Sequence, residues 1–343
     1  DGYKWGNSNA FYDKGGLREG DPGVESQTWE TVKKANVGIE LGLFKMAELQ
    51  VDFFHERRED IFMQRKNIPS SAGFPSAPWA NYGIVTNKGF DISLDLNKQI
   101  NKDWFISARA SVTYAKNKII EQDEDLGVLG TYRSSTGKPV GQIFGLVNDG
   151  LYTEADFEDV TTGKLKPGLP VPKFSDRVYP GDIKYLDLNG DNEITETDKT
   201  VIGGTVNPEL VYGFGINLSY KNIAFGAFFQ GNGRTYRIIG ENQKNFLPGS
   251  TIGAEGTIFT NASDAWTVDN PSQDVFYPRL HMGYNANNAQ VSDWWLKDMS
   301  MLRLKNVELG YSFSKNLIKK AAMEYARIFV RGTNLLQFSK FDL

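Results

Sequence analysis

Acidic and amide residues alternate in one short segment, residues 187–198, which reads DLNGDNEITETD. Oxygen-bearing groups occupy the ligand positions of a calcium-binding loop at this spacing: Asp187, Asn189, Asp191, Glu193 through its backbone carbonyl, and Asp198. A turn with such spacing brings several oxygen atoms around one centre, which suits a hard cation. The segment therefore predicts a structural site for Ca2+ or another divalent cation.

Two residues depart from the usual calcium-loop pattern. Asn192 stands where glycine is preferred, although asparagine tolerates the left-handed backbone that the turn needs. Asp198 replaces a bidentate glutamate, so we expect weak affinity, on the order of 10⁻⁴ to 10⁻³ M. The alternative is a turn closed by Asn and Asp side chains without a metal. Ile183 and Tyr185 alternate before the loop as in a strand, which argues against the helices of an EF-hand.

The sequence gives little support for an enzyme, a nucleic acid-binding protein or a helical membrane protein. The chain has no cysteine, His55 and His281 are its two histidines, and no carboxylate pair or nucleophile motif stands out, so we predict no enzyme. Its 38 Lys and Arg residues against 42 Asp and Glu residues make no generally basic face, so we expect no nucleic acid partner. No apolar run approaches the roughly 18 residues of a membrane-spanning helix.

The elements that must position such residues are strands, because apolar and polar residues alternate with a period of two. Phe90, Ile92, Leu94 and Leu96 form an apolar face opposite polar neighbours, and the apolar faces of residues 104–114 and 212–220 each begin and end in an aromatic residue. Strands of about 9 to 11 residues with apolar outer faces and aromatic ends are typical of membrane β-barrels. A change of phase near Lys305 predicts a bulge, and the alternative is that only the second half of this strand faces lipid.

Eight strands are predicted, at about residues 32–45, 47–63, 82–99, 104–120, 209–221, 223–235, 295–314 and 325–338. Tight turns alternate with long connections at about 64–81, 121–208 and 236–294. Outer-membrane barrels have short periplasmic turns and long extracellular loops. We therefore predict an all-β, antiparallel transmembrane barrel portion whose long connections are extracellular, with the calcium loop in the longest one.

Aromatic and charged residues on these elements are candidates for contact with other molecules. The loop aromatics Trp79, Tyr132, Trp266 and Tyr277 could stack on a substrate or fill a partner's pocket, or they could form the cores of the loops. Asp91, Asp95 and Arg109 lie on polar strand faces, so they are expected to line the lumen. For these three we favour contacts with a plug inside the barrel over contacts with substrate.

Five segments together resemble one family: TWETVKKANVG (28–38), NKGFD (87–91), PGDIKYLDLNGD (180–191), MLRLKNVELGY (301–311) and RGTNLLQFSKFD (331–342). Their order and spacing are similar to the C-terminal part of SusC/RagA-type TonB-linked (TonB-dependent) outer-membrane transporters of Bacteroidetes. The resemblance covers nearly the whole chain, residues 1–343.

The resemblance implies a 22-stranded barrel with a plugged lumen, of which the plug domain and the last strand would lie outside this chain. It also implies import of oligosaccharides or peptides, powered by TonB, with a SusD-like surface lipoprotein as a lid. A dimeric assembly of two transporters and two lipoproteins (SusC2D2), embedded in outer-membrane lipid, is a further implication. The alternative from another class is a secreted, calcium-stabilised β-rich glycan-binding protein or adhesin.

Overall fold

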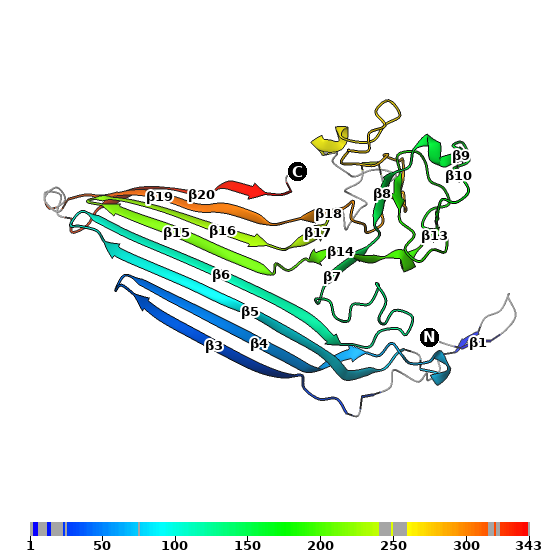
Figure 1. Cartoon of the computed structure of the whole chain (residues 1–343), viewed down its shortest axis with the longest axis horizontal. Helices are drawn as coiled ribbons and strands as arrows, with labels where there is room; N and C mark the ends of the chain where they lie inside the picture. The colour runs from blue at the N-terminus through cyan, green and yellow to red at the C-terminus, as the bar shows by residue number, and fades with distance from the viewer. Residues whose placement is uncertain are drawn as a thin grey trace.

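The chain folds into a long antiparallel sheet with a compact unit of loops at one end (Figure 1). The computed structural model describes residues 3–5, 12–14, 23–24, 26–74, 76–239, 248–249, 259–314, 319 and 323–341. The sheet has eight strands: β3 (Thr31–Leu43), β4 (Ala47–Gln64), β5 (Trp79–Gln99), β6 (Trp104–Glu121), β15 (Leu210–Tyr220), β16 (Ile223–Gly233), β19 (Met301–Ser312) and β20 (Arg327–Ser339). A short hairpin of β1 (Tyr3–Trp5) and β2 (Tyr12–Lys14) lies apart from it.

Each strand of the large sheet pairs with the strand before and after it along the wall, in the order β20-β19-β16-β15-β6-β5-β4-β3. All seven pairings are antiparallel. The tight turns lie at one end of the sheet and the long connections at the other (Figure 1). The prediction of an all-β antiparallel barrel wall of eight strands is confirmed, and the predicted strand limits are wrong by only a few residues.

Cross-strand register places apolar residues in continuous rows on one face of the sheet. One row joins Ile92, Val112, Tyr212 and Leu302 across four strand pairings, and the adjacent row joins Leu94 to Phe214 through Ala110. Aromatic residues close the band at both ends, because the rings of Trp104 and Tyr220 lie 4.6 Å apart near the tight turns, and Phe53, Phe90 and Tyr114 form a chain of rings near the loops. This banding is the pattern of a lipid-facing barrel wall.

The predicted bulge at Lys305 is confirmed. Phe228 pairs with Asn306 and Phe229 with Leu304, so Lys305 is the extra residue opposite β16, and the pairing with β20 shifts at the same place. The bulge restores the apolar phase, since Leu304 and Val307 then both join outward rows. The predicted single strand at residues 295–314 is wrong in one respect, because it is interrupted before Met301 and its first part forms the separate strand β18 (Leu296–Asp298).

The long connections fold together into one loop unit, formed by residues 122–208 and by the described residues 236–239 and 259–299 (Figure 1). Its elements are short: β7 (Gln142–Gly145), β8 (Asn148–Leu151), η2 (Glu154–Asp156), β9 (Phe157–Asp159), β10 (Lys164–Leu165), β11 (Val171–Pro172), β12 (Ile183–Tyr185), β13 (Glu193–Ile194), η3 (Glu196–Asp198), β14 (Thr200–Thr205), β17 (Tyr236–Ile238), η4 (Thr260–Ser263) and β18. A 3-10 turn, η1 (Ser70–Ala72), lies between β4 and β5.

The hydrophobic core belongs to this loop unit and not to the sheet. Side chains from both long connections meet in it, among them Leu146, Ile183, Tyr185, Tyr277 and Trp295, each at most 2% exposed. The sheet instead exposes many of its outward apolar side chains. Within the described part of the chain, no helix has the length and apolar character needed to cross a membrane.

Candidate functional site

The polar face of the sheet carries charged pairs that line a hollow of about 660 Å³. Asp95 and Arg109 are cross-strand partners, and the guanidinium Nε lies 2.5 Å from the carboxylate. Glu308 accepts hydrogen bonds from Arg327 at 2.7 Å and from Arg331 at 2.5 Å. The predicted position of Asp95 and Arg109 on a polar wall is confirmed, and both line the hollow.

Asp91, the third predicted wall residue, lies farther along the same face. Its carboxylate accepts a hydrogen bond from the hydroxyl of Thr113 at 2.6 Å. Small residues on this face leave room above the wall. A Cβ at Gly215 would lie 3.0 Å from the ring of Phe228, so a side chain at this position would displace the ring. Charged pairs and open space together form a polar surface suited to hold another folded segment or a polar solute.

Two neighbouring buried carboxylates hold the loops at the end of β6. Asp123 is 4% exposed and accepts hydrogen bonds from Arg65 Nε at 2.6 Å, from the backbone of Lys66 at 2.8 Å and from Asn67 Nδ2 at 2.7 Å. Burial acts to raise the pKa of the Asp123 carboxyl, but these donors outweigh burial and hold that pKa far below its usual range. The connection between β4 and β5 is thereby fastened to the next long connection.

Glu124 fastens residues 134–136 to the end of β6 by hydrogen bonds. Its carboxylate accepts from the hydroxyls of Ser134 at 2.6 Å, Ser135 at 2.7 Å and Thr136 at 3.0 Å, and from the Ser135 amide at 2.6 Å. Burial acts to raise the pKa of this carboxyl, yet the hydrogen bonds lower it to about 2. Glu124 is therefore charged wherever the protein is folded at ordinary pH.

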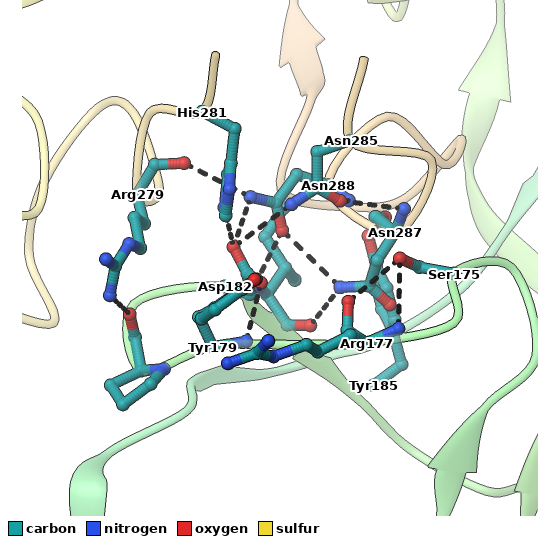
Figure 2. Close-up of polar contacts among 12 residues, drawn as sticks. Ser175, Arg177, Tyr179, Asp182, Tyr185, Arg279, His281, Asn285, Asn287 and Asn288 are labelled. Carbon is teal, nitrogen blue, oxygen red and sulfur yellow. Dashed lines mark hydrogen bonds and ion pairs between the residues drawn. The ribbon is translucent and has the colours of Figure 1, made fainter. Parts of the chain in front are cut away.

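A polar cluster joins the two long connections inside the loop unit (Figure 2). The fully buried carboxylate of Asp182 accepts from Asn288 Nδ2 at 2.8 Å and Asn285 Nδ2 at 3.2 Å, lies 2.5 Å from His281 Nε2, and accepts from the Tyr179 amide at 2.8 Å. Its histidine and asparagine partners lie about a hundred residues away in sequence, so one carboxylate fastens residues 179–185 to residues 279–288.

Buried asparagines complete this junction (Figure 2). Asn288 Oδ1 accepts from the Ile183 amide at 2.9 Å, Asn287 Nδ2 donates to the Ile183 carbonyl at 2.9 Å, and the Tyr185 hydroxyl donates to the Asn287 carbonyl at 2.8 Å. Burial strongly raises the pKa of the Tyr185 hydroxyl, so Tyr185 stays neutral and donates. The asparagines thereby bind the backbone of Ile183 in β12, a strand that also pairs with β8.

The predicted calcium loop forms a closed turn. Both Asp187 carboxylate oxygens accept backbone amides, from Gly190 at 2.7 Å and Asn192 at 2.8 Å, and Asn192 adopts the expected positive φ of 64°. Asn189 Nδ2 donates to the Asp191 carboxylate at 2.8 Å. Burial acts to raise the Asp187 pKa, but the amide donors lower it.

The side chains of the other two predicted ligand residues already have protein partners. Asp198 is fully buried and accepts from the amides of Leu188 and Thr195, at 2.9 and 2.8 Å, and the exposed Glu193 side chain, whose backbone carbonyl was the predicted ligand, pairs with Lys173 at 2.9 Å. Across the described ranges, no group of three or more acidic or histidine side chains is close enough to hold a metal ion. These hydrogen bonds close the loop by themselves, and calcium binding stays a prediction.

The four predicted contact aromatics divide into two pairs. Trp79 begins β5, is 46% exposed, and stacks on Phe62 with ring centroids 5.4 Å apart. Tyr132 is 40% exposed and donates from its hydroxyl to the Thr197 carbonyl at 2.6 Å, beside the calcium loop. Both can still reach another molecule.

Trp266 and Tyr277 instead belong to the core of the loop unit. Trp266 is 7% exposed, and Tyr277, which has no exposed surface, packs edge-on against Phe276 with ring centroids 4.7 Å apart. The suggestion that these two residues contact a substrate or partner is therefore wrong, and the second alternative, a loop core, holds for them. Both rings lie in a loop that has its own packed core, and their large apolar surface contributes to that core.

Sequence reasoning missed the residues that fasten the loop unit. Asp182 lies inside the family-like segment PGDIKYLDLNGD, but its partners at 281–288 follow no periodic pattern. Asp123 and Glu124 read as part of an acidic run, QDEDL, which usually signals a solvated loop. The run of asparagines at 285–288 was the one available signal, since repeated amides suit buried hydrogen-bond junctions.

Known proteins similar to this chain agree on one family. A TonB-dependent receptor of Formosa agariphila is 30% identical over 96% of this chain and 32% of its own length. The TonB-dependent receptor SusC of Bacteroides thetaiotaomicron is 22% identical over 86% of this chain and 27% of its own. No family model matches the chain. The chain spans about a third of the length of the curated relatives it matches.

Solved structures show the same fold. The RagAB peptide importer in its closed-closed state superposes with a TM-score of 0.66 at 24% identity, covering 97% of this chain and 34% of the other. The RagAB peptide transporter gives a TM-score of 0.65 at 22% identity. A banded antiparallel wall, a loop unit at one end and these relatives lead to one conclusion: over most of its length the chain is similar to part of the TonB-dependent receptors of the bacterial outer membrane, SusC among them, and it shares the fold of the corresponding part of RagAB.

Proposed function

We propose that this chain forms part of the wall and the surface vestibule of an importer that carries oligosaccharides or peptides across the outer membrane. The observation that carries the proposal is the division of the sheet into an outward apolar band and an inward polar face with paired charges. Energy would come from TonB acting on a plug inside the barrel, and no covalent chemistry is needed. The RagAB structures are named as a peptide importer, which supports the peptide class, and the oligosaccharide class rests on the family resemblance of the sequence.

A SusD-like lipoprotein seated on the loop unit is the partner that fits this arrangement. The loop unit has its own packed core, so it offers a rigid surface and not a set of separate loops. Trp79 and Tyr132 remain exposed on the long connections, where they could contact the lid or the substrate. Two transporters and two lipoproteins could assemble as a dimer. The alternative of a secreted adhesin has no comparable support, because an exposed apolar band is unsuited to a soluble protein.

Uptake by cells tests the proposal. Labelled oligosaccharides and labelled peptides are supplied to the parent strain, to a strain that lacks the full-length receptor, and to a strain that lacks TonB. We expect uptake of one substrate class to be lost in both mutant strains and restored by the receptor gene. Import of both classes at the parental rate without the receptor would refute an import function.

The luminal charges are proposed to hold the plug. Asp95 and Arg109 bind one another, but the Arg109 side chain is still 77% exposed and free to meet a second partner. Replacing both residues with alanine in the full-length receptor should loosen the plug and raise the single-channel conductance in planar bilayers. Ser111→Ala, a small change on the same face, is the control. Unchanged conductance in the double variant would instead assign these residues to substrate contact.

A further inference from the structure

Lysines gather at the end of the sheet where the tight turns lie. Lys45 lies in the turn between β3 and β4, Lys102 in the turn between β5 and β6, and Lys221 in the turn between β15 and β16. Lys98, near the end of β5, continues the outward apolar series of Leu94 and Leu96. All four side chains are exposed, and we call them the lysine rim.

Aromatic and aliphatic side chains lie directly beside the lysine rim on the outward face. Trp104 and Tyr220 are paired across β6 and β15, and Ile223 extends the row to Tyr311. Phe44, next to Lys45, is 85% exposed. Tryptophan and tyrosine prefer the level of the lipid headgroups, so this row marks where the hydrocarbon ends and the lysines lie just beyond it.

The charges of the lysine rim are largely uncompensated by protein. Lys221 Nζ lies 4.0 Å from the carboxylate of Asp103, at the limit of an ion pair, and 5.3 Å from the centre of the Tyr220 ring. Among the residues that the structure describes, none forms an ion pair with Lys45, Lys98 or Lys102.

Two lysines at the opposite end of β3 are matched by acids. Lys33 pairs with Glu59 at 2.5 Å, and Lys34 pairs with Glu56 at 2.8 Å. These two charges are neutralised within the protein, whereas those of the lysine rim are left for an external anion.

We propose that the lysine rim binds the phosphate groups of anionic phospholipids in the periplasmic leaflet of the outer membrane. Three features select a lipid over a soluble anion: the rim continues the apolar band, it follows the contour of the bilayer surface, and lysine reaches headgroups by extending its flexible stem. The acyl chains lie against the outward row that contains Ile223. The proposal rests on the barrel orientation of the proposed function, with the tight turns in the periplasm.

Native mass spectrometry of the detergent-purified full-length receptor tests the proposal. Phosphatidylglycerol and the zwitterionic phosphatidylethanolamine are titrated separately, and the quadruple variant with Lys45, Lys98, Lys102 and Lys221 changed to glutamine is compared with the parent. We expect the parent to retain phosphatidylglycerol preferentially and the variant to bind it at least about tenfold more weakly, because each lysine near an anionic surface contributes to attraction.

A matched control removes the same charge from the loop unit, with Lys138, Lys164, Lys166 and Lys173 changed to glutamine. This control should keep parental binding of phosphatidylglycerol. Equal binding by the rim variant and the parent, equal loss in the control, or full competition by inorganic phosphate would overturn the proposal. Heat-modifiable migration in electrophoresis shows that each variant is folded.

Labelling in intact cells separates failure of the orientation from failure of lipid binding. The single variant Lys102→Cys should resist a membrane-impermeant maleimide, whereas Lys166→Cys should react. Reaction at position 102 would place the tight turns at the cell surface and refute both proposals. Protection at position 102 without preference for phosphatidylglycerol would refute the lipid site alone.

Discussion

Replacing Glu124 with glutamine should release residues 134–136 from the end of β6. The lowering of the Glu124 pKa from 4.5 to about 2 corresponds to about 3 kcal/mol of interaction with the charged form, at about 1.4 kcal/mol per unit. Glutamine keeps one acceptor oxygen but carries no charge, so we expect a loss of roughly 1.5 to 3 kcal/mol, which is about the contribution of a hydrogen bond to a charged group. Local opening should become about ten- to 150-fold more frequent.

Hydrogen exchange measured by mass spectrometry on residues 122–140 of the full-length receptor reports this opening. The carboxyl has a lower pKa in the folded state than in the unfolded state, so its stabilisation is complete above about pH 4.5 and is lost as the pH falls through about 2. The difference between parent and variant should therefore be large at pH 6 and shrink at pH 3, after correction for intrinsic exchange.

Asp125→Asn is the matched control, since Asp125 is the next acidic residue and is exposed. It should leave exchange in this segment unchanged. Equal protection of parent and Glu124→Gln at pH 6, or a difference that does not depend on pH, would refute the reasoning that the charge of Glu124 holds the loop.

Three further predictions address the wall, the calcium loop and the loop unit. Phe214→Arg, in the middle of the apolar band, should cost about 2 to 4 kcal/mol in urea folding titrations in lipid vesicles, whereas Asn217→Arg on the polar face should cost far less. Calorimetric titration with Ca2+ should give a Kd on the order of 10⁻⁴ to 10⁻³ M, and Asp187→Asn should abolish the heat; no heat from the parent would contradict the site. Gly181→Ala should destabilise the loop unit by about 1 to 3 kcal/mol in proteolysis assays, because φ is +92° and the new Cβ would lie 2.3 Å from the indole ring of Trp266. Gly190→Ala is the control and should cost less, because its φ is similar but its new Cβ would meet open space.

The wall could be predicted from sequence because its constraints are local and periodic. A strand that crosses a bilayer must present one apolar face to the lipid over about ten residues. The alternation in residues 90–96 or 212–220 is therefore long enough to be recognised in the sequence without knowledge of the neighbouring strand. The bulge at Lys305 was also readable, since one extra residue reverses the apolar phase.

The loop unit could not be predicted in the same way because its core is built from non-local contacts. Trp266 and Tyr277 stand in segments with no periodic pattern, and burial there depends on residues 146–194 of the other long connection. Asp182 is one acidic residue among 42 Asp and Glu residues. Only its contacts with His281 and Asn288 in the folded chain identify it as a buried carboxylate. The geometry of the calcium turn was readable because its residues are adjacent in the chain.

The shared core of the two long connections has a consequence for evolution and for engineering. Both long connections supply residues to one core and to the junction around Asp182, so neither can drift or be exchanged without the other. We expect successful chimaeras with related receptors to transplant both connections as one cassette and to keep the wall strands of the recipient. Selection for new nutrients would then act on a paired module, with only its outermost surface free to diversify residue by residue.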